Sequence, residues 1–221
     1  MSEQQLCFQF ETGLLERICS DMNLRESFRR VKKNKGAPGI DGVTIDQYEI
    51  NLEQELKQLR QEVLNWTYKP TPVKRVEIPK PGGKGTRLLG IPLIKDRVLH
   101  MAIKLVLEPI IDPTFSESSF GFRPRRNQQQ AILQAKKIVQ AGNEFIVDID
   151  LSKFFDRIHH DRLIHRLKNY IEDKRVLRLI GMILRGGIMI NGIKTPSVEG
   201  SVQGSPLSPL LSNVVLDELD K

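Results

Sequence analysis

Hydrophobic positions recur with helical spacing along much of this chain. The spacing of Leu52, Leu56, Leu59 and Val63 predicts one helix over residues 47–66. Residues 94–111 are apolar on nearly all sides, which is typical of a buried helix. Shorter helical patterns predict further helices over 14–22, 24–31, 126–141, 161–170, 174–185 and 206–219, the last with Ser205 as its N-cap.

Other segments have the pattern of strands. Residues 71–79 alternate apolar and charged side chains, and 86–91 return after a glycine-rich turn, so the two predict an antiparallel hairpin. A second hairpin is expected over 188–195, because its Asn191-Gly192 pair suits a turn with positive φ. Together with the helices, these segments predict an α+β fold.

A further strand pattern, over 145–151, carries the most informative chemistry. One face of the predicted strand is apolar, while the other presents Asp148 and Asp150. Magnesium takes oxygen ligands and commonly uses one or two carboxylates together with substrate phosphates. No second acidic pair that could complete such a site follows before Lys221, so the sequence predicts an incomplete two-metal site.

Charge points to a polyanionic partner. The 221 residues include 34 Lys and Arg against 27 Asp and Glu, which gives a net charge of +7. The excess is concentrated in segments 24–35 and 69–104, and the rest of the chain is mildly acidic. A nucleic-acid surface beside a metal centre fits this distribution. A solvated Lys-rich face is the alternative.

Composition also bears on location. No apolar run is long enough for a membrane-spanning helix, and the N-terminus has no secretory pattern. Cys7 and Cys19 lack metal-type spacing and are expected to be reduced thiols. We therefore expect a cytoplasmic protein without a membrane partner.

Six short motifs occur in an order that is more specific than any one of them. They are Gly39-Ile-Asp-Gly42, Ile78-Pro-Lys-Pro81, Arg87-Leu-Leu-Gly-Ile-Pro92 with Asp96-Arg97, Ser119-Phe-Gly-Phe-Arg-Pro124, Asp150-Leu-Ser-Lys-Phe-Phe-Asp156, and Gln203-Gly-Ser-Pro-Leu-Ser-Pro-Leu-Leu-Ser-Asn213. From about Leu24 onward, the chain resembles the N-terminal part of a bacterial group II intron reverse transcriptase and maturase.

The resemblance implies a right-hand polymerase, with helical fingers that carry a small antiparallel β-hairpin and with an incomplete palm. It divides the chain into an N-terminal helical extension (1–23), fingers (24–143) and partial palm (144–221). The Tyr-x-Asp-Asp hairpin that follows in the family is absent from this sequence. The fragment is therefore expected to bind RNA but not to polymerise.

Asp150 matches the family's first palm carboxylate, which is catalytic and binds both magnesium ions. The backbone carbonyl of Leu151 would be a further metal ligand. Asp148 shares the face of Asp150 but does not match the motif, so it is expected to be structural. Adjacent His159 and His160 lack Cys or Glu partners and are expected to be structural rather than metal ligands.

The resemblance also supplies five nucleotide-binding candidates. Lys80 and Arg87 match positions that contact the triphosphate, although an exposed turn also explains Lys80. Phe155 would contact the sugar and favour deoxynucleotides, with ordinary core packing as the alternative. Gln203 and Gly204 would lie at the sugar and base, where glycine lets the backbone approach closely.

RNA-binding candidates are basic residues in three places. Six lie in the first basic segment: Arg25, Arg29, Arg30, Lys32, Lys33 and Lys35. Lys74 and Arg75 would contact the template or nucleotide. Arg123 would either bind the template backbone or brace the fingers, and the sequence leaves both roles open.

The parent enzyme would copy RNA into DNA with magnesium and deoxynucleoside triphosphates. It would bind an RNA template, a DNA primer and its own intron RNA, and would assist splicing and mobility. A non-catalytic splicing cofactor and a retron or diversity-generating reverse transcriptase are the alternatives. Apolar Val214, Val215 and Leu219 are expected to lack partners, which leaves room for a homodimer.

Overall fold

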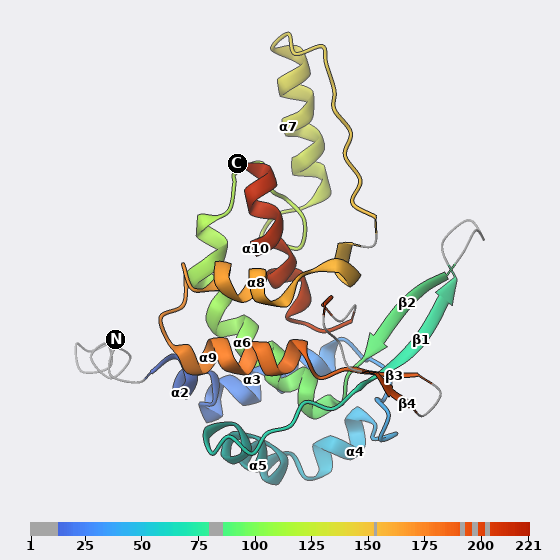
Figure 1. Cartoon of the computed structure of the whole chain (residues 1–221), viewed down its shortest axis with the longest axis vertical. Coiled ribbons are helices and arrows are strands. Elements are labelled where there is room, and N and C mark those ends of the chain that lie inside the picture. The colour runs from blue at the N-terminus through green and yellow to red at the C-terminus, as the bar shows by residue number, and fades with distance from the viewer. Residues whose placement is uncertain (1–12, 80–85, 153, 191–192, 196–198, 202–203) are drawn as a thin grey trace.

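A computed structural model describes residues 13–79, 86–152, 154–190, 193–195, 199–201 and 204–221 (Figure 1). The described helices are α2 (Leu14–Ile18), α3 (Asp21–Lys33), α4 (Ile45–Ile50), α5 (Leu52–Leu64), α6 (Ile94–Ile111), α7 (Gln128–Gln140), α8 (His160–Leu167), α9 (Lys174–Leu184) and α10 (Ser208–Asp220). Two short 3₁₀ turns are η1 (Asp112–Thr114) and η2 (Phe154–Arg157). The strands are β1 (Val73–Pro79), β2 (Thr86–Ile91), β3 (Ile188–Ile190) and β4 (Ile193–Thr195).

Helix α6 is the centre of the hydrophobic core. It covers the range predicted from its apolar composition, and most of its side chains are buried. Helix α3 packs against it through Leu24, Phe28 and Val31. The side-chain amide of Asn23 donates to the carbonyl of Ala102 at 3.1 Å, which fixes one helix against the other.

The start of α6 is tied to the entry of β1 by a buried carboxylate. The Tyr68 hydroxyl donates to Asp96 Oδ1 at 2.7 Å, and the Thr71 amide donates to Oδ2 at 3.3 Å. Burial raises the pKa of Asp96 to about 6, although these two hydrogen bonds act to lower it. The contact sets where the β1–β2 hairpin leaves the helical core.

The strands form one sheet in the order β2-β1-β3-β4. Both predicted hairpins are confirmed: β1 pairs antiparallel with β2, and β3 pairs antiparallel with β4. A short parallel pairing of Val73 and Lys74 with Ile188 and Met189 joins the hairpins, and local sequence patterns did not predict it.

Two of the differences from the predicted helices concern where a helix is interrupted or begins. The single helix expected over 47–66 is two helices, because Thr44 and Gln47 form a capping box at the start of α4 and the chain breaks at Asn51. The last helix begins at Ser208, two residues later than expected. Ser205 Oγ instead accepts the Leu207 amide in the turn before it.

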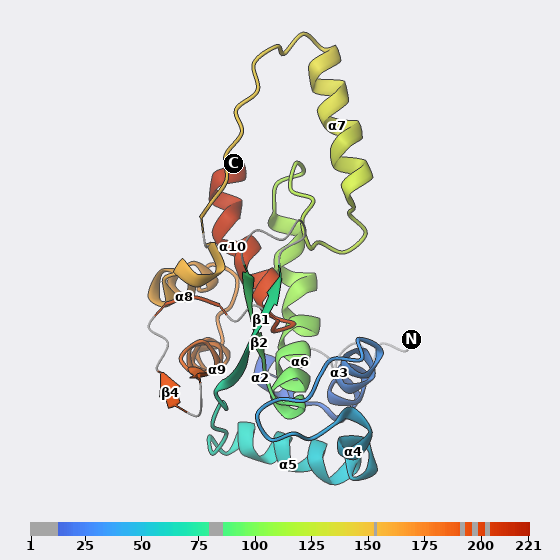
Figure 2. The ribbon, with the colours of Figure 1, turned by 90° about the vertical axis from the view of Figure 1, so that its right-hand side faces the viewer.

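The strand predicted over 145–151 is wrong for this structure. These residues form no strand, and they lead back from the tip of the projecting α7 toward the rest of the chain (Figures 1 and 2). Phe145 is 95% exposed, and no residue of α7 is buried. A strand needs a neighbour for its backbone groups, and none of the described strands pairs with this segment.

The apolar surface expected near the C-terminus is smaller than predicted. Val214 is buried in the core and Val215 packs partly against it, so only Leu219 of the three is exposed. The basis for a homodimer at this surface is therefore wrong for Val214 and Val215. Among the described residues, no helix has both the length and the apolarity that a membrane crossing requires.

Candidate nucleotide and nucleic-acid site

An open pocket of about 410 Å³ lies where α3, α6, η2 and the segment before α10 meet. It brings together Phe155 and Gly204, two residues predicted from separate motifs to bind a nucleotide. Its other lining residues are Asn34, Met101, Lys104, Phe122, Ser205, Pro206, Ser208 and Pro209. Phe155 is half-buried and packs edge-on against Phe154 at a centroid distance of 5.7 Å.

Position 204 requires glycine for two reasons, which are its backbone conformation and its close approach to β2. Its φ is +115°, a conformation that residues with a side chain rarely adopt. A Cβ atom on Gly204 would lie 2.3 Å from the carbonyl oxygen of Gly90 in β2. The expected close approach at this glycine is therefore to the β1–β2 hairpin, which holds the pocket wall against β2.

A buried polar pair anchors the next residue to α6. Ser205 Oγ lies 2.9 Å from His100 Nδ1, and it accepts the amide of Leu207 at 3.3 Å. Complete burial lowers the pKa of His100 to about 3, so the ring is neutral near pH 7. Sequence reasoning missed His100, and its signal was a lone titratable residue inside an apolar helix.

Arg97 is a second residue that sequence reasoning missed, and it holds the Gly39-Ile-Asp-Gly42 motif. Arg97 is buried at the start of α6, and its Nη2 donates to the carbonyl of Ala37 at 2.8 Å. A Cβ on Gly39 would lie 2.7 Å from the side chain of Leu93, so the motif packs closely on the residue before α6.

Phe122 is the other aromatic wall of the pocket, and its conformation is unusual. It is 70% exposed and has a φ of +55°. Bulky residues with positive φ are genuine outliers. Phe122 belongs to the Ser119-Phe-Gly-Phe-Arg-Pro124 motif, but the motif alone predicts no role for its ring.

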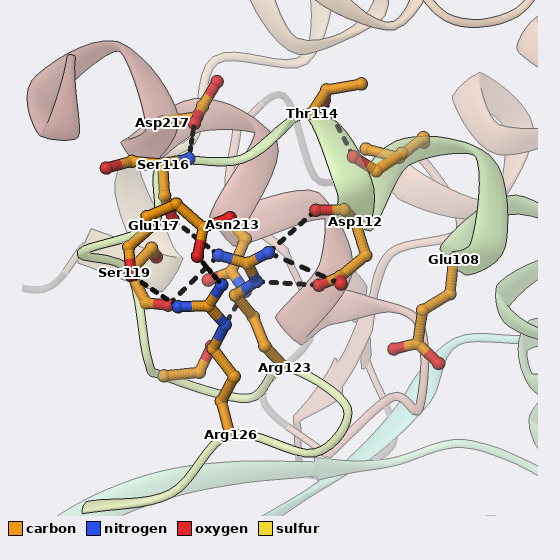
Figure 3. A network of polar contacts seen from close by, with 12 residues as sticks. Glu108, Asp112, Thr114, Ser116, Glu117, Ser119, Arg123, Arg126, Asn213 and Asp217 are labelled. Atoms are coloured by element: carbon orange, nitrogen blue, oxygen red, sulfur yellow. Dashed lines mark hydrogen bonds and ion pairs between the residues drawn. The ribbon is translucent and has the colours of Figure 1, made fainter. Parts of the chain in front are cut away.

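Arg123 braces the loop and does not face solvent (Figure 3). Its Nε donates to Asp112 Oδ1 at 2.8 Å, and Nη2 donates to the Asp112 carbonyl at 2.8 Å. Its Nη1 donates to the carbonyls of Ser116 and Ser119 at 2.6 and 3.1 Å. Of the two predicted roles, template binding is wrong in this conformation, because each guanidinium nitrogen is used within the protein.

The same network joins the loop to α10 (Figure 3). The Ser116 amide donates to Asp217 Oδ1 at 2.9 Å, and Asn213 Nδ2 donates to the Gly121 carbonyl at 2.8 Å. Arg126 pairs with Glu117 at 2.6 Å on the outer side. The loop that carries Phe122 is therefore fixed on both sides of that residue.

The predicted metal-binding residues lie in the extended segment. Asp148, Asp150 and Leu151 are all exposed. Carboxylate oxygens are the ligands that magnesium takes, so Asp150 fits an ion shared with substrate phosphates. No group of three or more His, Cys, Asp or Glu side chains suited to a metal occurs within the described ranges.

The fingers candidates are only partly described. Lys80 and Gln203 lie outside the described residues. Arg87 lies in β2, with its backbone opposite Ile78 of β1. On β1, Lys74 is exposed and Arg75 is half-buried.

The basic face of α3 is largely neutralised by neighbouring acids. Arg25 pairs with Asp21 and Glu53, Arg29 and Arg30 both pair with Glu26 at 2.7 Å, and Lys32 pairs with Glu49 at 2.6 Å. Within the part of the chain that the structure describes, Lys33 and Lys35 have no ion pair. The free positive charge is therefore at the C-terminal end of this helix.

The two adjacent histidines both contact the protein backbone. His159 Nδ1 accepts the Arg162 amide at the start of α8, at 3.5 Å. His160 Nε2 lies 2.7 Å from the Gly200 carbonyl, and burial lowers its pKa. Both rings therefore hold the segment after η2 in place.

Comparisons with known proteins agree on one family. The sequence profile described as "Reverse transcriptase (RNA-dependent DNA polymerase)" matches residues 78–221. Protein YkfC of Escherichia coli (strain K12) is 37% identical, over 94% of this chain and 56% of the relative. The group II intron-encoded protein LtrA of Lactococcus lactis subsp. cremoris is 35% identical, over 88% of this chain and 32% of the relative.

A solved structure is similar as well. A chain of the partial Cas6-RT-Cas1--Cas2 complex has a TM-score of 0.64 and 26% identity, and the match covers 95% of this chain and 34% of that one. The chain thus spans between about a third and just over half of the proteins that it matches here.

Proposed function

The chain belongs to the reverse transcriptase family, and on that premise we propose that it forms the fingers (24–143) and part of the palm (144–221) of a group II intron-type enzyme. The whole enzyme would copy RNA into DNA, and it would bind its own intron RNA to assist splicing and mobility. The similarity to LtrA supports the intron type.

The observation that carries this proposal is the meeting of Phe155 and Gly204 in one pocket beside the β1–β2 hairpin. These residues come from motifs almost fifty positions apart in the sequence. Their convergence, with Gly204 against β2, places a pocket wall and the fingers hairpin next to each other. A nucleoside triphosphate needs this combination of a shaped wall and nearby cations.

The residues would divide the work as follows. Arg87, and Lys80 from the turn beyond β1, would neutralise charge on the triphosphate, where Arg binds bidentately. The Phe155 ring would limit the space beside the sugar and so exclude a 2′-hydroxyl. Asp150 would hold magnesium together with the Leu151 carbonyl, and the bound ion would stabilise charge on the phosphates.

RNA binding would begin at the end of α3, where Lys33 and Lys35 have no ion pair within the described residues. Contacts of Lys with phosphate are electrostatic and weaken steeply with salt. Structured intron RNA would be recognised largely by its shape.

A non-catalytic RNA-binding splicing cofactor is the second candidate. It would need only the basic surface at the end of α3, where Lys33 and Lys35 have no ion pair within the described residues. The two candidates differ in one measurable property, which is DNA synthesis by the whole protein.

The decisive experiment measures DNA synthesis by the full-length enzyme on an RNA template with a DNA primer. We expect Asp150→Ala to abolish synthesis, because it removes a metal ligand, while intron RNA binding is retained. Asp148→Ala is the matched control and should retain most of the activity. Synthesis that survives Asp150→Ala would contradict the metal assignment. A wild-type enzyme that binds RNA but makes no DNA would favour the splicing cofactor.

A further inference from the structure

We propose that Phe122 is a stacking platform for an unpaired base of single-stranded RNA that enters the pocket it shares with Phe155. The inference rests on the proposed function only in its choice of ligand, since the pocket and the exposed ring are features of the structure itself.

The backbone at Phe122 argues for a role other than folding. Its φ of +55° costs free energy for a bulky side chain, and Gly or Asn would adopt it with less strain. Its ring is 70% exposed, so the strain is not offset by burial in the core. Strained residues of this kind cluster at ligand sites, where the surrounding structure holds them in place.

The surrounding structure does hold Phe122. The preceding carbonyl, of Gly121, accepts from Asn213 of α10, and the next residue is the buried Arg123. A ring on such a support presents its face with little loss of entropy on binding. Its position is therefore prepared before any ligand arrives.

The chemistry of the pocket fits a nucleotide of a single strand. Aromatic side chains bind successive bases by stacking, and nearby cations follow the backbone phosphates. Lys104 lines the pocket, and its ion pair with Glu108 is long, at 3.4 Å, so the ammonium keeps donors for a phosphate. Asn34 brings the C-terminal end of α3 to the same pocket, directly before Lys35.

The test uses this chain and a short single-stranded RNA that contains 2-aminopurine. Wild-type protein should quench the fluorescence of the base on binding. Phe122→Ala should weaken binding by about 5- to 100-fold and abolish the quenching, which is the range for loss of one base–aromatic stack. Because stacking is not ionic, the slope of log Kd against log salt should stay unchanged.

Three further variants separate binding from folding. Phe122→Trp retains a ring and should keep both affinity and quenching. Phe122→Asn relieves the backbone, so it should raise the melting temperature while it weakens binding. Phe145→Ala removes an exposed ring outside the pocket and is the matched control, with no expected effect.

The inference is overturned if Phe122→Ala binds and quenches like wild type, if Phe145→Ala loses as much affinity, or if the wild-type chain does not bind the RNA at low salt.

These results are distinct from those of the activity assay. DNA synthesis with unaltered binding by Phe122→Ala would remove this inference alone. Stacking without DNA synthesis would remove the polymerase proposal alone.

Discussion

Replacement of Gly204 by alanine should destabilise the protein more than backbone strain alone can explain. Two costs apply. The φ of +115° is unfavourable for any residue with a Cβ, at about 1–3 kcal/mol. The new Cβ would also lie 2.3 Å from the Gly90 carbonyl oxygen, so the backbone of β2 or of the pocket segment must move, at about 1–3 kcal/mol more.

Gly142 provides the matched control. Its φ of +96° is similar, but a Cβ there would have no heavy atom within 4 Å. Gly142→Ala therefore carries the first cost without the second. The difference between the two variants isolates the contact with β2 and should be about 2 kcal/mol, from the overpacking cost above.

The assay is urea and thermal unfolding of the wild-type chain and both variants, followed by circular dichroism. For a domain of this size, about 2 kcal/mol corresponds to a difference of roughly 4–8 °C in melting temperature. If Gly204→Ala is no less stable than Gly142→Ala, the close approach to β2 does not limit this position and the reasoning is refuted.

Two further predictions concern buried charges. Arg123→Met should cost about 3–5 kcal/mol of stability because it leaves the Asp112 carboxylate without its partner. Arg126→Met loses only an exposed ion pair and should cost under about 1 kcal/mol. Equal unfolding midpoints of the two variants in urea would contradict the structural role of Arg123. The pKa of Asp96 is raised to about 6, so this carboxyl makes the protein less stable as pH rises from about 4 to 6. The pKa of His100 is lowered to about 3, so this ring makes the protein more stable as pH rises from about 3 to 6.5. Asp96→Asn should therefore uncover a rise of up to about 1.4 kcal/mol per pH unit between pH 4 and 6, and a profile parallel to that of wild type would contradict this balance.

Elements that depend on local pattern were predictable from the sequence. The strand at 86–91 and the helix at 94–111 have the predicted bounds, because alternation and continuous apolarity act within each segment. The segment 145–151 has an equally clear strand pattern but no strand pairing, because a strand depends on a neighbour as well as on its own residues.

The candidate site shows the same division. Motif order identified Phe155 and Gly204, and the structure places both in one pocket. Single residues could not reveal that Arg123 donates its hydrogen bonds to Asp112 and to backbone carbonyls. Nor could they reveal that acids on neighbouring helices pair with Arg25 and Lys32 of α3. Such pairings arise between segments and leave no local signal.

The parallel contact between β1 and β3 has a consequence for the order of folding. Val73 and Ile188 lie more than a hundred positions apart, and helices α6 to α9 lie between them in the chain. The β1–β2 hairpin can form from local sequence, but its attachment to β3 requires closure of a long loop and is therefore slow. Until then β1 presents an unpaired edge, which is the kind of surface at which chains aggregate. Successful synthesis of this protein thus depends on how quickly the last strands arrive to cover the first.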